Sequence, residues 1–219
     1  MKKIIIFGLG QIAELTYDLI QQIGDLEVKA FTANREHILS DQFLNLPVYS
    51  IEEIKQKINC EDHYFITAIS YKNLNENRER IYRQLKEKNF KFTNIIHPSS
   101  ICRFDKIGEN NIIFELNNFQ KGVSIGNNCI FWSFNHIGHH SKIADNCFLS
   151  SHVVISGSVT LKENSFFGVN SSVRDNVSIG KKCVIGAGSL VLKDIPDYSI
   201  VKNKTTEISK IKSTMLLKK

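Results

Sequence analysis

Residues 125–147 read IGNNCIFWSFNHIGHHSKIADNC and show the pattern from which the fold is predicted. Large apolar residues recur in it at every sixth position, and the same spacing extends in both directions over sixteen positions: Ile101, Ile107, Ile113, Phe119, Ile125, Phe131, Ile137, Ile143, Leu149, Ile155, Leu161, Phe167, Val173, Ile179, Ile185 and Val191. The residue four places later is usually small, as in Cys129, Ser141, Cys147, Val153, Ser165, Ser171, Cys183 and Ser189. A six-residue period of this kind predicts a solenoid of short parallel strands.

A second period, of eighteen residues, marks the coils of this solenoid. Five similar segments start at residues 107, 125, 143, 161 and 179, and their fourth residues are Asn110, Asn128, Asn146, Asn164 and Lys182. Asparagine tolerates a left-handed backbone better than most residues. We therefore expect three hexads per triangular coil, a tight corner at this column, and a core that is closed by the stacking of coils.

The first hundred residues follow a different pattern, in which strands alternate with helices. We expect strands at residues 2–8, 28–32, 64–69 and 92–96, and helices from the first glycine turn to residue 23, at 51–58 and at 77–88. Such alternation predicts a small parallel α/β sheet. The chain is thus divided into a Rossmann-like α/β domain (residues 1–98), an all-β parallel β-helix (residues 99–201) and a basic C-terminal tail (residues 202–219).

Two glycines, Gly8 and Gly10, occupy the first turn from strand to helix. Backbone N–H groups at such a turn can hold a phosphate. The third glycine of the dinucleotide fingerprint is replaced by Ala13, and the second strand ends around Thr32 without the carboxylate that a NAD ribose requires. The turn therefore favours a nucleotide diphosphate, with Gly8, Gly10 and Thr32 as candidate contacts, although a glycine turn without a ligand is an alternative.

The composition limits the class of protein. The 219 residues carry a net charge of +6, with ordinary apolar and charged fractions. No apolar run approaches the ~20 residues of a membrane span, and the first apolar run is too short for a secretion signal. We expect a cytoplasmic protein in which Cys129, Cys147 and Cys183 are reduced core residues.

The positive charge is concentrated near the C-terminus, where six lysines lie among the last eighteen residues. Such a tail is typically a solvated segment, and it could also attract an anionic ligand such as coenzyme A or a nucleotide. The sequence contains no nucleic-acid recognition motif and no basic stripe interleaved with aromatic residues. We therefore expect no nucleic-acid partner.

Three histidines, His136, His139 and His140, lie together within residues 125–147. His139 follows an inward position and stands near a corner, and Gly157 comes eighteen residues later, which places it beside His139 in the next coil at about 4.8 Å. A histidine can act as a general base near neutral pH, and a free glycine N–H can stabilise an oxyanion. The pair predicts acyl transfer, while a histidine-rich surface corner is the alternative.

On these motifs the chain resembles the bacterial nucleotide-sugar acetyltransferases related to sialic-acid O-acetyltransferase and to the UDP-linked bacillosamine-precursor N-acetyltransferase. The most specific match is GHHSKI at residues 138–143, followed by ISGSV at 155–159, FGVNS at 167–171 and IGAGS at 185–189. The resemblance implies a left-handed β-helix, acetyl-CoA as cosubstrate and no metal.

The resemblance also implies roles for single residues. His139 would be the general base and Gly157 the oxyanion donor. The coenzyme would contact Val169, Gly186 and Ala187 in a channel between the subunits of a homotrimer. The glycine loop would hold the nucleotide, and His136 and His140 are candidate substrate contacts.

Three departures from the family pattern are visible. The acidic residue that usually follows the base is His140 here, and Asp145 is a candidate substitute. A second family histidine, which contacts the coenzyme, corresponds to Phe148. The usual Pro-Ala-Lys at the end of the solenoid is replaced by VKNKT at residues 201–205.

The leading hypothesis is N-acetylation of a nucleotide-linked amino sugar of the 4-amino-4,6-dideoxy type, for surface-polysaccharide or glycan biosynthesis. O-acetylation of a sugar such as sialic acid is a close alternative, because the fold does not separate amine from hydroxyl acceptors. A γ-type carbonic anhydrase would need three converging histidines, and the spacing of His136 and His140 does not match that family. A non-catalytic scaffold is a further alternative. The sequence leaves open the sugar, the ring position, the nucleotide base and the acyl length.

Overall fold

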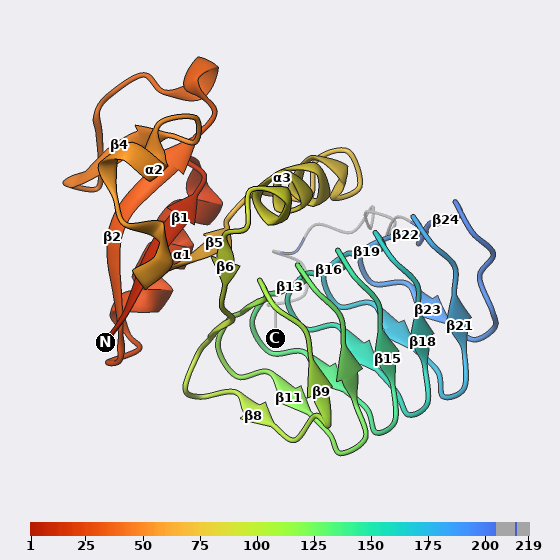
Figure 1. Ribbon diagram of the computed structural model, residues 1–219. Helices are drawn as coiled ribbons and strands as arrows, with labels where there is room; N and C mark the ends of the chain where they lie inside the picture. Colours follow the sequence, from red (N-terminus) through yellow and green to blue (C-terminus); the bar gives the residue numbers. More distant parts are fainter. Residues whose placement is uncertain (205–212, 214–219) are drawn as a thin grey trace.

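The computed structural model describes residues 1–204 and residue 213, and it consists of two parts packed side by side (Figure 1). The first part is an α/β domain whose six-stranded sheet has the order β3-β4-β2-β1-β5-β6, parallel except for β3. Its elements are β1 (Lys2–Phe7), α1 (Gln11–Gln21), β2 (Leu26–Ala33), the 3-10 helix η1 (Arg35–His37), β3 (Gln42–Phe43), β4 (Leu46–Ser50), α2 (Ile54–Lys57), the 3-10 helix η2 (Cys60–Asp62), β5 (His63–Thr67), α3 (Glu76–Glu87) and β6 (Lys91–Phe92).

The central strand β1 explains why helices cover both faces of this sheet. Its apolar residues alternate between the two faces, as strand geometry requires. Ile4 packs in one cluster with Leu19 of α1, whereas Ile5 packs in another with Leu85 of α3. The predicted parallel α/β sheet is therefore confirmed.

Two elements of this domain differ from the sequence prediction. The helix expected at residues 51–58 is only the four-residue α2. The hairpin of β3 and β4 was not predicted, because its two turn residues, Leu44 and Asn45, both adopt positive φ (50° and 62°) without the Asn-Gly or Asp-Gly pair that usually signals such a turn.

The second part is a parallel β-helix with three faces of two-residue strands. The first face contains β7 (Ile95–Ile96), β10 (Ile112–Ile113), β13 (Ile130–Phe131), β16 (Phe148–Leu149), β19 (Phe166–Phe167), β22 (Val184–Ile185) and β24 (Ile200–Val201). The second contains β8 (Ile101–Cys102), β11 (Asn118–Phe119), β14 (His136–Ile137), β17 (Val154–Ile155), β20 (Ser172–Val173) and β23 (Leu190–Val191). The third contains β9 (Lys106–Ile107), β12 (Ser124–Ile125), β15 (Lys142–Ile143), β18 (Thr160–Leu161) and β21 (Ser178–Ile179).

The inward column of hexad residues forms the core of the β-helix, as predicted. Strands eighteen residues apart pair in register, for example Ile137 with Ile155, and the residues from Ile113 to Val191 in this column are buried. The prediction is wrong at Ile101, which is 51% exposed. Ile101 lies opposite Asn118 instead of Phe119, because the stretch from β8 to β9 is one residue shorter than the equivalent stretch in the next coil.

The corner between the third and first faces carries the predicted left-handed column. Its residues have φ values of 60°, 58°, 62°, 61° and 52°, at Asn110, Asn128, Asn146, Asn164 and Lys182. The side chains also form a ladder, in which Asn110 Nδ2 donates to Asn128 Oδ1 (2.8 Å) and Asn128 Nδ2 donates to Asn146 Oδ1 (2.7 Å). The ladder satisfies amides that would otherwise be buried without partners.

The β-helix begins earlier than the expected boundary at residue 99. Ile95 and Ile96 form β7, which pairs with β10 of the next coil, so the predicted strand at 92–96 is divided between the two parts of the chain. Among the described residues, no helix combines the length and apolar character needed to cross a membrane. Most of the predicted basic tail, residues 205–212 and 214–219, lies outside the described residues.

Candidate active site

The corner between the second and third faces carries His139, and we call it the His139 corner. The turn that joins β14 to β15 exposes both His139 and the next residue, His140, which has a φ of +59°. The backbone N–H of His139 donates to Gln120 Oε1 at 2.9 Å, one coil earlier. The side chain of His139 is therefore presented to solvent from a rigid corner.

Gly157 lies directly beside His139 in the next coil, as the period predicted. A Cβ atom on Gly157 would lie 2.5 Å from both Nε2 and Cε1 of the His139 ring. Real Cβ atoms do not approach other atoms so closely, so any other residue here would displace the imidazole. The glycine gives His139 Nε2 direct access to the backbone of the next coil.

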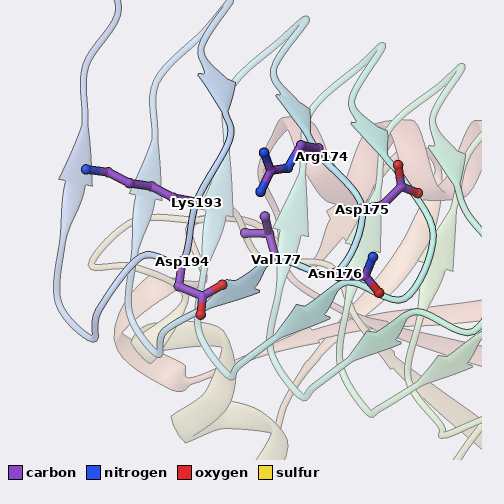
Figure 2. A pocket seen from close by; sticks show the side chains of 6 residues that line it. All are labelled: Arg174, Asp175, Asn176, Val177, Lys193 and Asp194. Carbon is purple, nitrogen blue, oxygen red and sulfur yellow. The ribbon is translucent and has the colours of Figure 1, made fainter.

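The N–H of Gly157 is not free in the isolated chain, contrary to the sequence expectation. It donates to Asp175 Oδ1 at 2.7 Å. Asp175 comes eighteen residues after Gly157, so the same period that identified Gly157 could have found it. Asp175 also borders a hollow of about 700 Å³ lined by residues 174–177 and by Lys193 and Asp194 (Figure 2).

His140 stands directly after His139, at the position where the resemblance implies an acidic residue. Its Nδ1 lies 3.1 Å from Nδ1 of His139, and its ring rests on Gly122 of the preceding coil. A hydrogen bond between two neutral Nδ1 atoms needs one donor and one acceptor. If His139 donates, its Nε2 carries no proton and can act as a base toward the Gly157 side.

Asp145, the candidate substitute, is at a different corner. Its Oδ1 accepts from the backbone N–H of Asn127 at 2.7 Å, on the corner between the third and first faces. The prediction that Asp145 replaces the acidic partner is wrong, because β15 of the third face lies between His139 and Asp145 and places them on different corners.

His136 is separated from His139 and Gly157. It is the outward residue of β14 on the second face, in register with Asn118 and Val154. It is half-buried and points away from the core rather than along the His139 corner. The structure thus brings together His139, His140 and Gly157, and leaves His136 on the adjoining flat face.

The predicted coenzyme residues lie on the corner between the first and second faces, which we call the Val169 corner. Val169 is 47% exposed, and Ala187 and Gly186 follow it in the next coil. A Cβ on Gly168 would meet the N atom of Ala187 at 2.5 Å, so the coils are closely stacked here. The whole second face separates this corner from His139 within one chain.

Phe148 does not belong to this group. Its side chain is only 2% exposed and packs edge-on against Tyr71 (4.9 Å between ring centroids) and parallel to Phe166 (5.6 Å) beneath the α/β domain. The expected coenzyme contact is wrong for this side chain, because the docked domain covers the first face at that position.

The glycine loop lies between two cavities. One, of about 670 Å³, is lined by Gly8, Gly10, Tyr71 and Trp132 among others, and the second, of about 380 Å³, by the same loop with Asn34, His37 and Arg80. Gly8 has a φ of +133°, and a Cβ there would lie 2.5 Å from the carbonyl oxygen of Ala68, so only glycine fits.

Thr32 does not line either cavity. It is fully buried, and its hydroxyl donates to the carbonyl oxygen of Tyr49 at 2.9 Å, so its proposed substrate contact is wrong. The polar group available near the end of β2 is instead Asn34, whose Oδ1 is buried without a hydrogen-bond partner among the described residues. The described residues also contain no group of three or more His, Cys, Asp or Glu side chains placed to hold a metal ion.

Comparisons with known proteins agree with this architecture. The family model "Bacterial transferase hexapeptide (six repeats)" matches residues 122–157, and "Hexapeptide repeat of succinyl-transferase" matches residues 158–193. No curated protein sequence matches the chain.

Similar folds occur in three solved structures. A mutant of perosamine N-acetyltransferase from Caulobacter crescentus, in complex with CoA and GDP-perosamine, has a TM-score of 0.79 and 22% identity, over 91% of this chain and 93% of that chain. The acetyltransferase domain of PglB from Neisseria gonorrhoeae FA1090, in complex with acetyl coenzyme A, has a TM-score of 0.79 and 19% identity, over 91% and 95%. WeeI from Acinetobacter baumannii AYE has a TM-score of 0.80 and 17% identity, over 92% and 97%. The chain therefore carries the hexapeptide repeats of bacterial transferases and has the two-part fold, α/β domain followed by β-helix, that was predicted from its sequence.

Proposed function

We propose that the protein is an acetyl-CoA-dependent N-acetyltransferase that acts on the amino group of a nucleotide-linked amino sugar. The observation that carries this proposal is His139 Nε2 beside the backbone of Gly157 on an exposed corner of a hexapeptide β-helix. A glycine loop with two adjoining cavities supports a nucleotide site on the same chain. The similar fold of perosamine N-acetyltransferase, solved with CoA and GDP-perosamine as a histidine mutant, supports the same reaction class.

The reaction follows from these positions. The amine nitrogen attacks the thioester carbon of acetyl-CoA, a C–N bond forms, and the carbonyl oxygen becomes an oxyanion. His139 Nε2 takes the proton that the nitrogen loses, while the N–H of Gly157, once released by Asp175, donates to the oxyanion. Collapse breaks the C–S bond, and the proton on His139 passes to the departing thiolate to give coenzyme A. His140 holds Nδ1 of His139, so that Nε2 remains the basic nitrogen.

A complete site requires more than one chain. The large glycine-loop cavity includes Trp132, which lies on the Val169 corner two coils before Gly168, whereas His139 lies across the second face. This face and its edges expose an unusual number of apolar side chains: Ile101, Leu116, Phe134, Val154, Val169, Leu190 and Leu192, each between 39% and 66% exposed. We propose a homotrimer that covers this face and brings the Val169 corner of one subunit, with its acetyl-CoA, to the His139 corner of its neighbour.

The reaction class is tested by thiol release from acetyl-CoA. The acceptors are UDP-, dTDP- and GDP-linked 4-amino-4,6-dideoxy sugars, and His139→Ala is the matched variant. We expect turnover on one acceptor and a loss of at least about 100-fold in kcat for His139→Ala. Release with hydroxyl sugars alone would replace this proposal with sugar O-acetylation. The N-acetylated nucleotide sugars made by the proposed reaction would serve surface-polysaccharide or glycan assembly. We propose that the reaction takes place in the cytoplasm.

The shared site is tested by mixing two inactive variants. A Cβ on Gly10 would meet nothing within 4 Å, so Gly10→Trp fills the cavity without disturbing the backbone. His139→Ala and Gly10→Trp are each expected to be inactive. Co-refolded in equal amounts, they should regain roughly a quarter of wild-type activity, because that share of sites pairs an intact loop with an intact histidine. No recovery in mixed oligomers would place both parts of the site in one subunit.

A further inference from the structure

Among the described residues, Asp175 is the carboxylate that lies against the backbone of Gly157 beside His139. A Cβ on Gly157 would lie 2.5 Å from His139 Nε2 and 3.1 Å from Asp175 Oδ1, so the imidazole and the carboxylate border the same small volume. This is the volume in which the general base would meet the acceptor. An acceptor bound there must contact both groups.

The carboxylate is available for a cation. Only its Oδ1 is engaged, by the Gly157 N–H, and none of the ion pairs among the described residues involves Asp175. The basic side chains that line the adjoining hollow are those of Arg174 and Lys193. In Figure 2 these point to one side, while the Asp175 carboxylate points to the other, toward the coil of Gly157.

A carboxylate in this position can distinguish amine acceptors from hydroxyl acceptors, which the fold by itself does not separate. A sugar amine is largely an ammonium ion at neutral pH, with a positive charge and three N–H donors. A carboxylate binds it through charge-assisted hydrogen bonds, which are about twice as strong as neutral ones. A sugar hydroxyl offers one neutral donor to the same carboxylate.

We propose that Asp175 binds the ammonium group of the acceptor and thereby selects an amino sugar over its hydroxyl counterpart. This inference rests on the proposed acetyl transfer and adds the residue that sets acceptor specificity. The bound ammonium releases one proton to water before its lone pair attacks, and the second proton goes to His139 during the attack. The ammonium draws the Asp175 carboxylate away from the N–H of Gly157. This N–H can therefore donate to the oxyanion only when an amine is bound.

The experiment compares binding of paired nucleotide sugars by titration calorimetry. The probes are UDP-, dTDP- and GDP-linked 4-amino-4,6-dideoxyhexoses and the same compounds with a 4-hydroxyl. Asp175→Asn removes the charge but keeps an oxygen that can accept from Gly157. The matched control is Asp145→Asn, because Asp145 accepts from the Asn127 N–H at the same 2.7 Å on a remote corner.

We expect the wild-type protein and Asp145→Asn to bind the amine about tenfold or more tightly than the hydroxyl compound. In Asp175→Asn this preference should shrink to roughly twofold, through weaker amine binding with hydroxyl binding unchanged. If the wild-type protein acetylates the amino sugar but Asp175→Asn keeps the full preference for the amine over the hydroxyl compound, this inference is overturned and the proposed function is not. A wild-type protein that binds no member of the panel overturns the proposed function as well.

Discussion

The guanidinium of Arg78 forms four hydrogen bonds from the α/β domain to the β-helix, and its removal tests how much this contact stabilises the protein. Arg78 projects from α3 and is fully buried. Its five hydrogen bonds reach Asn75 Oδ1 (2.9 Å) and the backbone carbonyls of Asn128 (3.1 and 3.2 Å), Asn146 (3.2 Å) and Cys147 (3.3 Å). Burial lowers the pKa of Arg78 to about 10, so the side chain remains charged at neutral pH.

The cost of Arg78→Met follows from what the side chain leaves behind. The carbonyl of Cys147 also accepts from the N–H of Ile130 (3.0 Å), but those of Asn128 and Asn146 have no other donor among the described residues. A buried polar group left without a partner costs about 1–3 kcal/mol. The substitution removes the donor, whereas the two backbone carbonyls remain buried without a partner. We therefore expect a loss of about 4 kcal/mol in the free energy of unfolding. Arg78→Lys keeps the charge but not the planar fork, so it should lose about half as much.

Urea denaturation followed by tryptophan fluorescence measures this loss. The single tryptophan, Trp132, stacks on Phe114 (4.9 Å between centroids) and lines the cavity between the two parts. The matched control is Arg83→Met on the same helix, because Arg83 is exposed and its one ion pair within the described part of the chain is with Glu79. We expect the control to lose less than about 1 kcal/mol. A loss for Arg78→Met within about 1 kcal/mol of the control would refute the reasoning.

Three other outcomes are expected. His140→Ala should lower kcat by about tenfold or more at a similar KM for acetyl-CoA, whereas His140→Asp should keep most of the wild-type kcat, because His or Asp at this position can hold Nδ1 of His139. An unchanged kcat of the alanine variant in steady-state kinetics would contradict the orienting role. Val169→Arg should weaken acetyl-CoA binding in calorimetry without lowering Tm, since the side chain is exposed; wild-type affinity would remove the Val169 corner from the coenzyme site. The buried thiols of Cys129, Cys147 and Cys183 should react with a thiol reagent only on unfolding, because they are inaccessible and burial raises the pKa of Cys129; prompt labelling in the native protein would contradict their core position.

Periodicity made the β-helix predictable from the sequence. In a coil of three hexads each inward residue has an equivalent neighbour eighteen positions away, so one column of apolar residues specifies strands, corners and register together. The pattern does not show where a coil is one residue short. Ile101 keeps the spacing of six but leaves the core, because the shortened turn before β9 shifts its strand by one position. The start of the β-helix at β7 was missed for a similar reason, since Ile95 and Ile96 also continue the apolar pattern of the α/β domain.

The eighteen-residue period alone predicts which residues of the candidate site share a column, because residues eighteen apart stack wherever the coils are regular. It therefore predicted the contact of His139 with Gly157, and the same arithmetic extends to Asp175. The contacts of each side chain within its column, in contrast, depend on residues from other parts of the chain. Thr32 donates to the carbonyl oxygen of Tyr49, and Phe148 packs against the ring of Tyr71. These partners are distant in sequence and keep both side chains away from the predicted ligand sites. Hydrogen-bond direction and burial depend on such contacts, which a local period does not encode, and so the structure alone showed that the N–H of Gly157 is held by Asp175.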